Sequence, residues 1–122
     1  MQATIHHITT YNNIVGAVLR SRREQLGLEQ AEMAKKVGLT QPSYSRIESG
    51  KTSLTLLQLN EFAPHFKLTA PNFIAHVEKI KTDMVRQGIN VSPKKAPNIG
   101  EGVTNLLIGG ALLAIVAQMM KK

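Results

Sequence analysis

The chain has 122 residues and a formal net charge of +7, with 15 Lys and Arg against 8 Asp and Glu. This length suits one small domain with appendages and excludes a large multidomain enzyme, because a compact core typically uses about 100 to 150 residues. Without cysteine, neither a disulfide framework nor a thiolate metal site can form, and a reducing intracellular setting is expected. The positive balance favours a polyanionic partner, nucleic acid before an anionic membrane surface.

Residues 1–12 form a polar N-terminal arm that lacks the basic region and the apolar stretch of a secretory signal. We therefore expect the protein to be cytoplasmic. His6 and His7 have no acidic or cysteine partner at a ligand-like spacing, so the arm is predicted to be flexible and to bind no metal.

A first helix is predicted after the arm. Asn12 or Asn13 can cap it, Gly27 ends it, and its apolar residues recur at helical spacing. These residues are Ile14, Val15, Val18, Leu19 and Leu26. Residues 30–37 predict a short second helix, with Met33, Ala34 and Val37 facing inward, and Gly38 then permits a tight turn.

The third helix is predicted from about residue 41 to residue 49, with Thr40 as its cap and Pro42 in its first turn. Ser53 or Thr55 can begin a fourth helix, which Pro64 should kink or shorten. The residues of this fourth helix expected to face inward are Leu56, Leu59, Phe62, Ala63 and Phe66.

Thr69 and Pro71 begin a fifth helix that continues to Gly88. One of its faces is apolar and must be covered, either by the fourth helix or by a second copy of the chain. This face consists of Phe73, Ile74, Val77, Ile80 and Met84. Residues 13–88 should thus form one helical domain without strands.

Residues 89–102 contain two prolines, two glycines and a lysine pair without periodicity, which predicts a linker. Residues 103–122 follow as an apolar C-terminal helix. This helix is expected to oligomerise or to pack on its own chain; the alternatives are a membrane anchor and a tail that binds a partner protein. The residues expected at its oligomer contact are Leu106, Leu107, Gly110, Leu113 and Ala114.

A membrane is the main competing environment for this tail. Residues 103–120 would span about 27 Å as a helix, against a bilayer core of about 30 Å. The run without polar side chains covers only residues 106–117, Asn105 and Gln118 would lie inside the span, and no Trp or Tyr flanks it. These features favour a protein contact over the bilayer.

The segment "LTQPSYSRIESGK" at residues 39–51 contains most of the residues expected to contact a partner. The second and third helices, joined by a tight glycine turn, have the layout of a helix-turn-helix, whose second helix lies in the DNA major groove. Gln41 can bond adenine, Arg46 can bond guanine, and Ser43 can serve a base or a phosphate. Gln30, at the start of the second helix, and Lys51 can hold phosphate.

Residues 14–68 resemble the Cro and phage-repressor (XRE) type of helix-turn-helix domain. The resemblance rests on Leu19 and Arg23, on "GLEQAEMAKKVGL", on "TQPSYSRIESGK" and on the Leu-rich fourth helix. It implies an all-α fold, a five-helix DNA-binding domain that usually dimerises on an inverted repeat and represses or activates transcription.

The resemblance also implies a role at each matching position. Base-reading positions correspond to Gln41, Pro42, Ser43 and Arg46, and phosphate-contact positions correspond to Gln30 and Lys51. Arg23 and Glu48 match a structural ion pair, while Ala34, Gly38 and Ile47 match packing and turn positions. Glu29 replaces the usual Ser or Thr cap of the second helix, where it is expected to interact with the helix dipole.

We therefore expect a sequence-specific transcriptional regulator, a repressor that binds double-stranded DNA as a dimer or higher oligomer through the fifth helix and the tail. No constellation for catalysis is present in the sequence, and no cofactor or metal is expected. The alternatives are an antitoxin-like or phage-control protein whose tail binds a partner, and a DNA-binding regulator tethered to the inner membrane with its DNA-binding domain in the cytoplasm.

Overall fold

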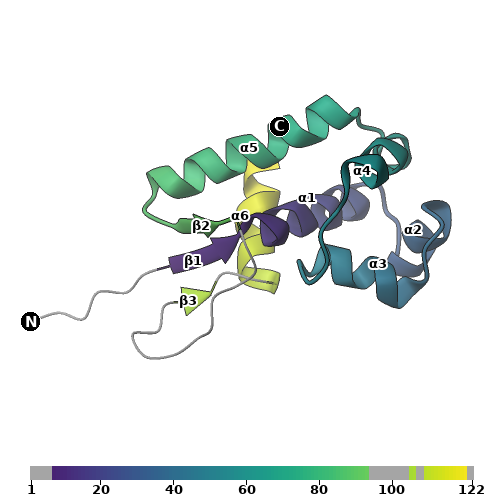
Figure 1. The fold of residues 1–122 in the computed structure, drawn as a ribbon, viewed down its shortest axis with the longest axis horizontal. Helices are drawn as coiled ribbons and strands as arrows, with labels where there is room; N and C mark the ends of the chain where they lie inside the picture. Colours follow the sequence, from purple (N-terminus) through teal and green to yellow (C-terminus); the bar gives the residue numbers. More distant parts are fainter. Residues whose placement is uncertain (1–6, 94–104, 107–108, 121–122) are drawn as a thin grey trace, which may run out of the picture.

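The computed structural model describes residues 7–93, 105–106 and 109–120. The chain is mostly helical, as predicted, and a small sheet is added to the helices (Figure 1). The elements in chain order are β1 (His7–Thr10), α1 (Tyr11–Gln25), α2 (Gln30–Lys36), α3 (Gln41–Glu48), α4 (Leu56–Phe62), the 3₁₀ helix η1 (Ala63–Phe66), α5 (Ala70–Arg86), β2 (Asn90–Ser92), β3 (Asn105–Leu106) and α6 (Gly109–Met120).

Helix α1 is the centre of the fold. It packs against α3, α5, α6, β1 and η1, so residues on every side of it are buried (Figure 1). Its N-cap is Thr10, whose hydroxyl accepts a hydrogen bond from the Asn13 backbone N–H at 3.0 Å. The predicted caps Asn12 and Asn13 are wrong, because the helix begins earlier, directly after β1.

Helices α1 and α3 approach so closely that only glycine fits between them. A Cβ at Gly16 would collide with the backbone carbonyls of Ile47 and Glu48, at the C-terminal end of α3. The missing side chain therefore sets how closely α3 lies against the central helix.

The fourth helix ends early, as the proline predicts. Thr55 caps α4 by accepting a hydrogen bond from the Gln58 N–H at 3.0 Å, and the chain changes to the 3₁₀ helix η1 at Ala63, one residue before Pro64. The inward placement of Leu56 is wrong: this residue is 80% exposed. It occupies the first turn of α4, whereas the core contacts of this helix are made by Leu59 and Phe62 in its later turns.

The apolar face of α5 is covered from within the chain. Phe73, Val77, Ile80 and Met84 are buried, and α5 packs against α1, β2 and α6. Ile74 is different, since it remains 40% exposed. The fourth helix was expected as one possible cover, but the central helix α1 takes that place.

A polar contact connects the start of α1 to α5. The Tyr11 hydroxyl donates to the Glu78 carboxylate at 2.8 Å, and Lys81 pairs with Glu78 at 3.2 Å. Partial burial, together with this carboxylate, raises the pKa of Tyr11 to about 12. The phenol therefore stays protonated and keeps its place as a donor at neutral pH.

Three short parallel strands bring together segments that lie far apart in the sequence. β1 lies between β2 and β3, with Ile8 opposite both Asn90 and Leu106 (Figure 1). Residues 7–10 were expected in a flexible arm and residues 90–92 in a linker, so both expectations are wrong for these residues. Because Thr9 and Thr10 are buried, their backbone needs hydrogen-bond partners, and strand pairing supplies them.

The C-terminal helix packs along α1 of its own chain. Leu112 and Val116 are buried in the core that α1 shares, Leu113 is half-buried and Ala114 is exposed. Gly110 lies in the first turn of this helix and Leu106 lies in β3, while Leu107 falls outside the described residues. Within the described part of the chain, no helix is long and apolar enough to cross a membrane.

Candidate nucleic-acid interface

Helices α2 and α3 are joined by four residues, Val37 to Thr40. Gly38 adopts a φ of +78° there, and the Leu39 N–H donates to the Ala34 carbonyl at 2.9 Å. Thr40 then caps α3 by accepting a hydrogen bond from the Ser43 N–H at 3.2 Å. The turn glycine and the threonine cap thus fix the direction in which α3 leaves α2.

Helix α3 has one buried face and one exposed face. Tyr44, Ile47 and Glu48 point into the core. The predicted base-reading residues lie on the other side, where Gln41, Pro42 and Arg46 are exposed and Ser43 is half-buried. The structure therefore brings these predicted residues together on a single solvent-facing surface that a groove could receive.

A buried ion pair between Arg23 and Glu48 holds α3 onto α1, as the resemblance to the XRE type of domain implied. The Arg23 Nε donates to Glu48 Oε2 at 2.7 Å and its Nη2 donates to Oε1 at 3.1 Å. Both residues are 7% exposed. The Arg23 Nη1 also donates to the Leu28 carbonyl at 2.7 Å, so the guanidinium joins α1, α3 and the loop before α2.

Tyr44 adds a further donor to the same carboxylate. Its hydroxyl donates to Glu48 Oε2, one turn along the same helix. Burial and the neighbouring carboxylate raise the pKa of Tyr44 well above its usual range, so the phenol remains a donor. The sequence analysis did not predict this bond, although the i,i+4 spacing of the two residues was a usable signal.

Gln30 connects this buried carboxylate to the exposed surface. Its Nε2 donates to Glu48 Oε1 at 2.9 Å, and its Oε1 accepts from the Gln41 Nε2 at 2.7 Å. The amide orientation of Gln41 is therefore set by a chain of hydrogen bonds that begins at Arg23. Sequence reasoning assigned Gln30 to phosphate and missed this second role.

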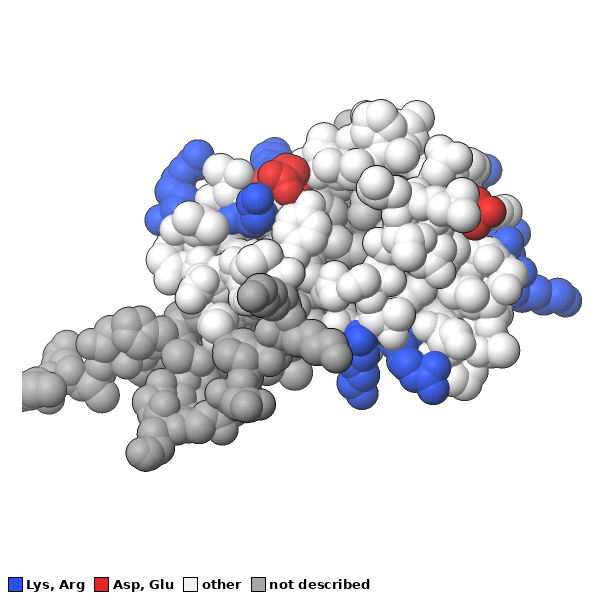
Figure 2. All heavy atoms as spheres, in the orientation of Figure 1, with Lys and Arg blue, Asp and Glu red and all other residues white. Residues whose placement is uncertain are grey.

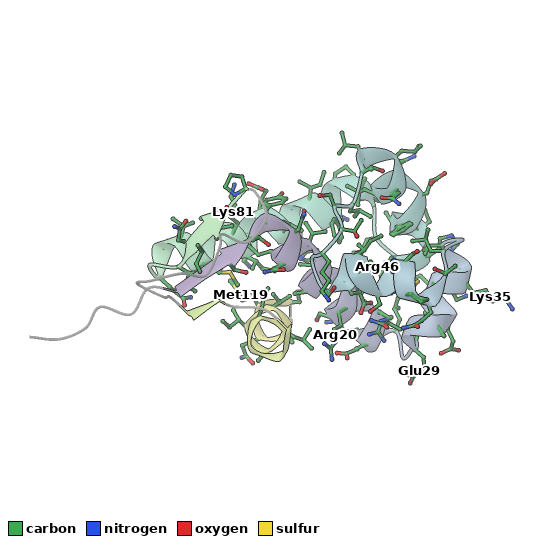
Figure 3. All side chains as sticks on the ribbon, turned by 60° about the horizontal axis from the view of Figure 1, so that its bottom comes forward. Arg20, Glu29, Lys35, Arg46, Lys81 and Met119 are labelled. Carbon is green, nitrogen blue, oxygen red and sulfur yellow. The ribbon has the colours of Figure 1, made fainter. Side chains whose placement is uncertain are left out.

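Cations border the exposed face of α3. In Figure 3, Arg46 lies on α3 and Lys35 at the outer edge of α2, and α6 is seen end-on near Arg20. Lys51 lies in the loop after α3, three residues beyond Glu48, and is exposed. None of the ion pairs among the described residues involves Arg46 or Lys51, so both charges are available to an outside partner.

The loop after α3 keeps Lys51 close to the helix. Gly50 has a φ of +79°, and the Lys51 N–H donates to the Arg46 carbonyl at 2.9 Å. A cavity of about 270 Å³ opens beside this loop, and Gln30, Ser45, Ser49 and Lys51 contribute to its lining. Polar and cationic groups of α2, α3 and the loop thus converge on one side of the domain.

The cap of α2 differs from the expected one in detail. The Glu29 backbone N–H donates to the Glu32 carboxylate at 2.8 Å, which satisfies one free donor at the helix start.

The two predicted packing residues are buried, in agreement with the prediction: Ala34 is 1% exposed and Ile47 is 2% exposed.

Comparison with known proteins identifies the same unit. Residues 19–67 match the family model described as "Helix-turn-helix". A crystal structure of the clp gene regulator ClgR from Corynebacterium glutamicum is similar at 18% identity and a TM-score of 0.59, covering 63% of this chain and 82% of that one. A second structure of ClgR, from C. glutamicum, gives 19% identity and a TM-score of 0.53, covering 57% of this chain and 90% of that one.

The likeness to ClgR concerns the fold, and the family match concerns the segment that contains α2, the turn, α3 and α4. That segment holds the exposed face of α3 and the buried Arg23–Glu48 pair. Residues 19–67 therefore match a helix-turn-helix model, in agreement with the resemblance to the XRE type of domain that was expected for this segment.

Proposed function

We propose that this protein is a transcriptional repressor that binds an inverted-repeat operator as a dimer, with α3 of each copy in a major groove. The observation that carries the proposal is the exposed polar face of α3, on which the Gln41 amide is held by Gln30. A recognition side chain that is oriented before binding loses less conformational entropy when it meets a base.

The proposed division of roles follows the chemistry of each side chain. Gln41 and Arg46 read bases, since an amide matches adenine and a guanidinium matches guanine O6 and N7. Pro42 and Ser43 lie at the leading end of α3 and contact base edges there. Gln30 and Lys51 hold phosphate on either side of the helix. The proposed function involves no catalytic step.

Replacing Gln41 or Arg46 with alanine tests the base contacts. Each substitution is expected to weaken binding to the operator by about 1 to 3 kcal/mol and to relax specificity at one base pair. The operator is first obtained by incubating the purified protein with fragmented DNA of its host at near-physiological salt and sequencing what is retained. Binding is then measured on this operator and on versions altered at each position.

Two controls separate base reading from general charge. Arg86→Ala removes an exposed arginine at the end of α5 and should leave binding unchanged. Lys51→Ala should weaken binding about equally on every sequence and reduce the salt dependence by about one phosphate contact. If the alanine variants at Gln41 and Arg46 discriminate between operators as the unaltered protein does, the assigned roles are incorrect.

A further inference from the structure

An exposed apolar surface remains on the helix-turn-helix domain. Leu56 and Leu57, in the first turn of α4, are 80% and 69% exposed, and Ile74 on α5 is 40% exposed. Single exposed apolar residues are ordinary, but clustered ones indicate a contact surface. The apolar residues Leu112 and Val116 of the tail, by contrast, are already buried within the chain.

An apolar groove of about 140 Å³ opens on this surface, between α4, α5 and the start of α1. Leu56, Leu59 and Leu54 line it from the α4 side, and Phe73, Ile74 and Val77 line it from α5. Leu57 follows Leu56 but does not line the groove. This exposed leucine therefore protrudes from the surface next to the groove. The hollow is of a size to receive an aliphatic side chain.

Charge limits what can cover this surface. None of the residues that line the groove is charged, and Figure 2 shows a broad white area over α4 and the neighbouring part of α5, with charged side chains of both signs at its edges. Two copies of a chain with a net charge of +7 repel each other, so a contact surface without charge is favoured because it adds no local repulsion. This area meets that condition for a second copy.

The pairing of a protrusion with a hollow has a symmetry consequence. In a two-fold contact, a residue of one copy meets a different residue of the other, and the same contact is made twice. We propose that a second copy of this chain docks on this surface, with Leu57 of each copy entering the groove of the other beside Ile74. The proposal names the contact for the dimer of the proposed function and rests on it.

The location also suits that function. Helix α4 follows α3 after a short loop, so a contact at the start of α4 holds the two DNA-facing helices in a fixed relation. A fixed relation is what two half-sites about one helical turn apart require. The predicted oligomer contact in the tail is replaced in this proposal by the α4–α5 surface.

The test uses Leu57→Glu and Ile74→Lys in the full chain, with self-association measured by sedimentation in the absence of DNA. The unaltered protein is expected to dimerise, and each variant to associate at least about a hundredfold more weakly, because each places an unpaired charge in an apolar contact. A glutamate in the first turn of α4 suits the helix dipole, so that helix should persist. Circular dichroism and thermal unfolding verify that both variants remain folded.

Mixing the two variants in equal amounts tests the pairing itself. In the mixed dimer, the new carboxylate of one copy faces the new ammonium group of the other, and the second contact keeps both original side chains. Association is therefore expected to return in the mixture. The matched control is Val85→Glu, which charges an exposed apolar residue at the far end of α5 and should leave the dimer intact.

Each outcome decides a different point. A monomeric unaltered protein, or dimeric single variants, would overturn the proposal, and monomeric variants that stay monomeric when mixed would overturn the pairing of Leu57 with the groove. Binding to a single half-site is measured alongside, because α3 is unchanged in both variants. If the unaltered protein shows no preference for any half-site, the proposed function fails while the dimer surface stands.

Discussion

Replacing Glu48 with alanine is expected to lower the free energy of unfolding by about 3 to 5 kcal/mol. The substitution leaves the Arg23 guanidinium buried without its carboxylate and removes the acceptor of the Tyr44 hydroxyl. The removal of one partner of a buried pair is costly, because the remaining charge is separated from water without compensation. Urea or thermal unfolding monitored by circular dichroism measures the change.

The matched control for this variant is Glu24→Ala. Glu24 pairs with Arg20 at 3.3 Å, but both side chains are more than 40% exposed. Water and salt screen such a pair, so its loss should change the free energy of unfolding by less than about 1 kcal/mol. Equal effects of the two substitutions would contradict a structural role for the buried pair.

The second large effect is expected from Gly16→Ala. In a helix, alanine is ordinarily favoured over glycine by about 1 kcal/mol, yet here its methyl group would collide with the backbone carbonyls of Ile47 and Glu48. Because backbone atoms cannot turn aside as a side chain can, α3 must shift. We expect the free energy of unfolding to fall by about 3 kcal/mol, measured by chemical denaturation.

DNA binding supplies a second measurement for this variant. A shifted α3 would weaken operator binding even under conditions where the protein is fully folded. Gly27→Ala is the comparison: nothing lies within 4 Å of its added methyl group, and only the strain of a φ of +74° opposes it, about 1 to 2 kcal/mol. A Gly16 variant as stable as the unaltered protein would show that the close approach is not required.

The helices of the DNA-binding domain could be predicted from the sequence because each has local signals. Thr40, Thr55 and Thr69 cap α3, α4 and α5 as predicted, and Gly38 makes the expected turn. The exposed face of α3 followed from the same pattern. Such signals act within one or two helical turns, so they need no knowledge of the rest of the fold.

The errors concern residues whose environment is set by distant parts of the chain. Thr9 is buried because β1 pairs with strands that come more than 80 residues later, and no local sequence pattern predicts this pairing. Leu56 was placed inward because it is apolar, although only tertiary packing decides which side of a first turn faces the core. The bond between Gln30 and Gln41 likewise depends on how α2 and α3 meet.

The arrangement of α1 also has a consequence for the order in which the chain is synthesised. This helix leaves the ribosome before α6, which covers one of its sides with Leu112 and Val116. The same holds for β1, whose two neighbouring strands come more than 80 residues later. Since domains begin to fold from the N-terminus during synthesis, the central helix completes its packing only after α6 has been synthesised.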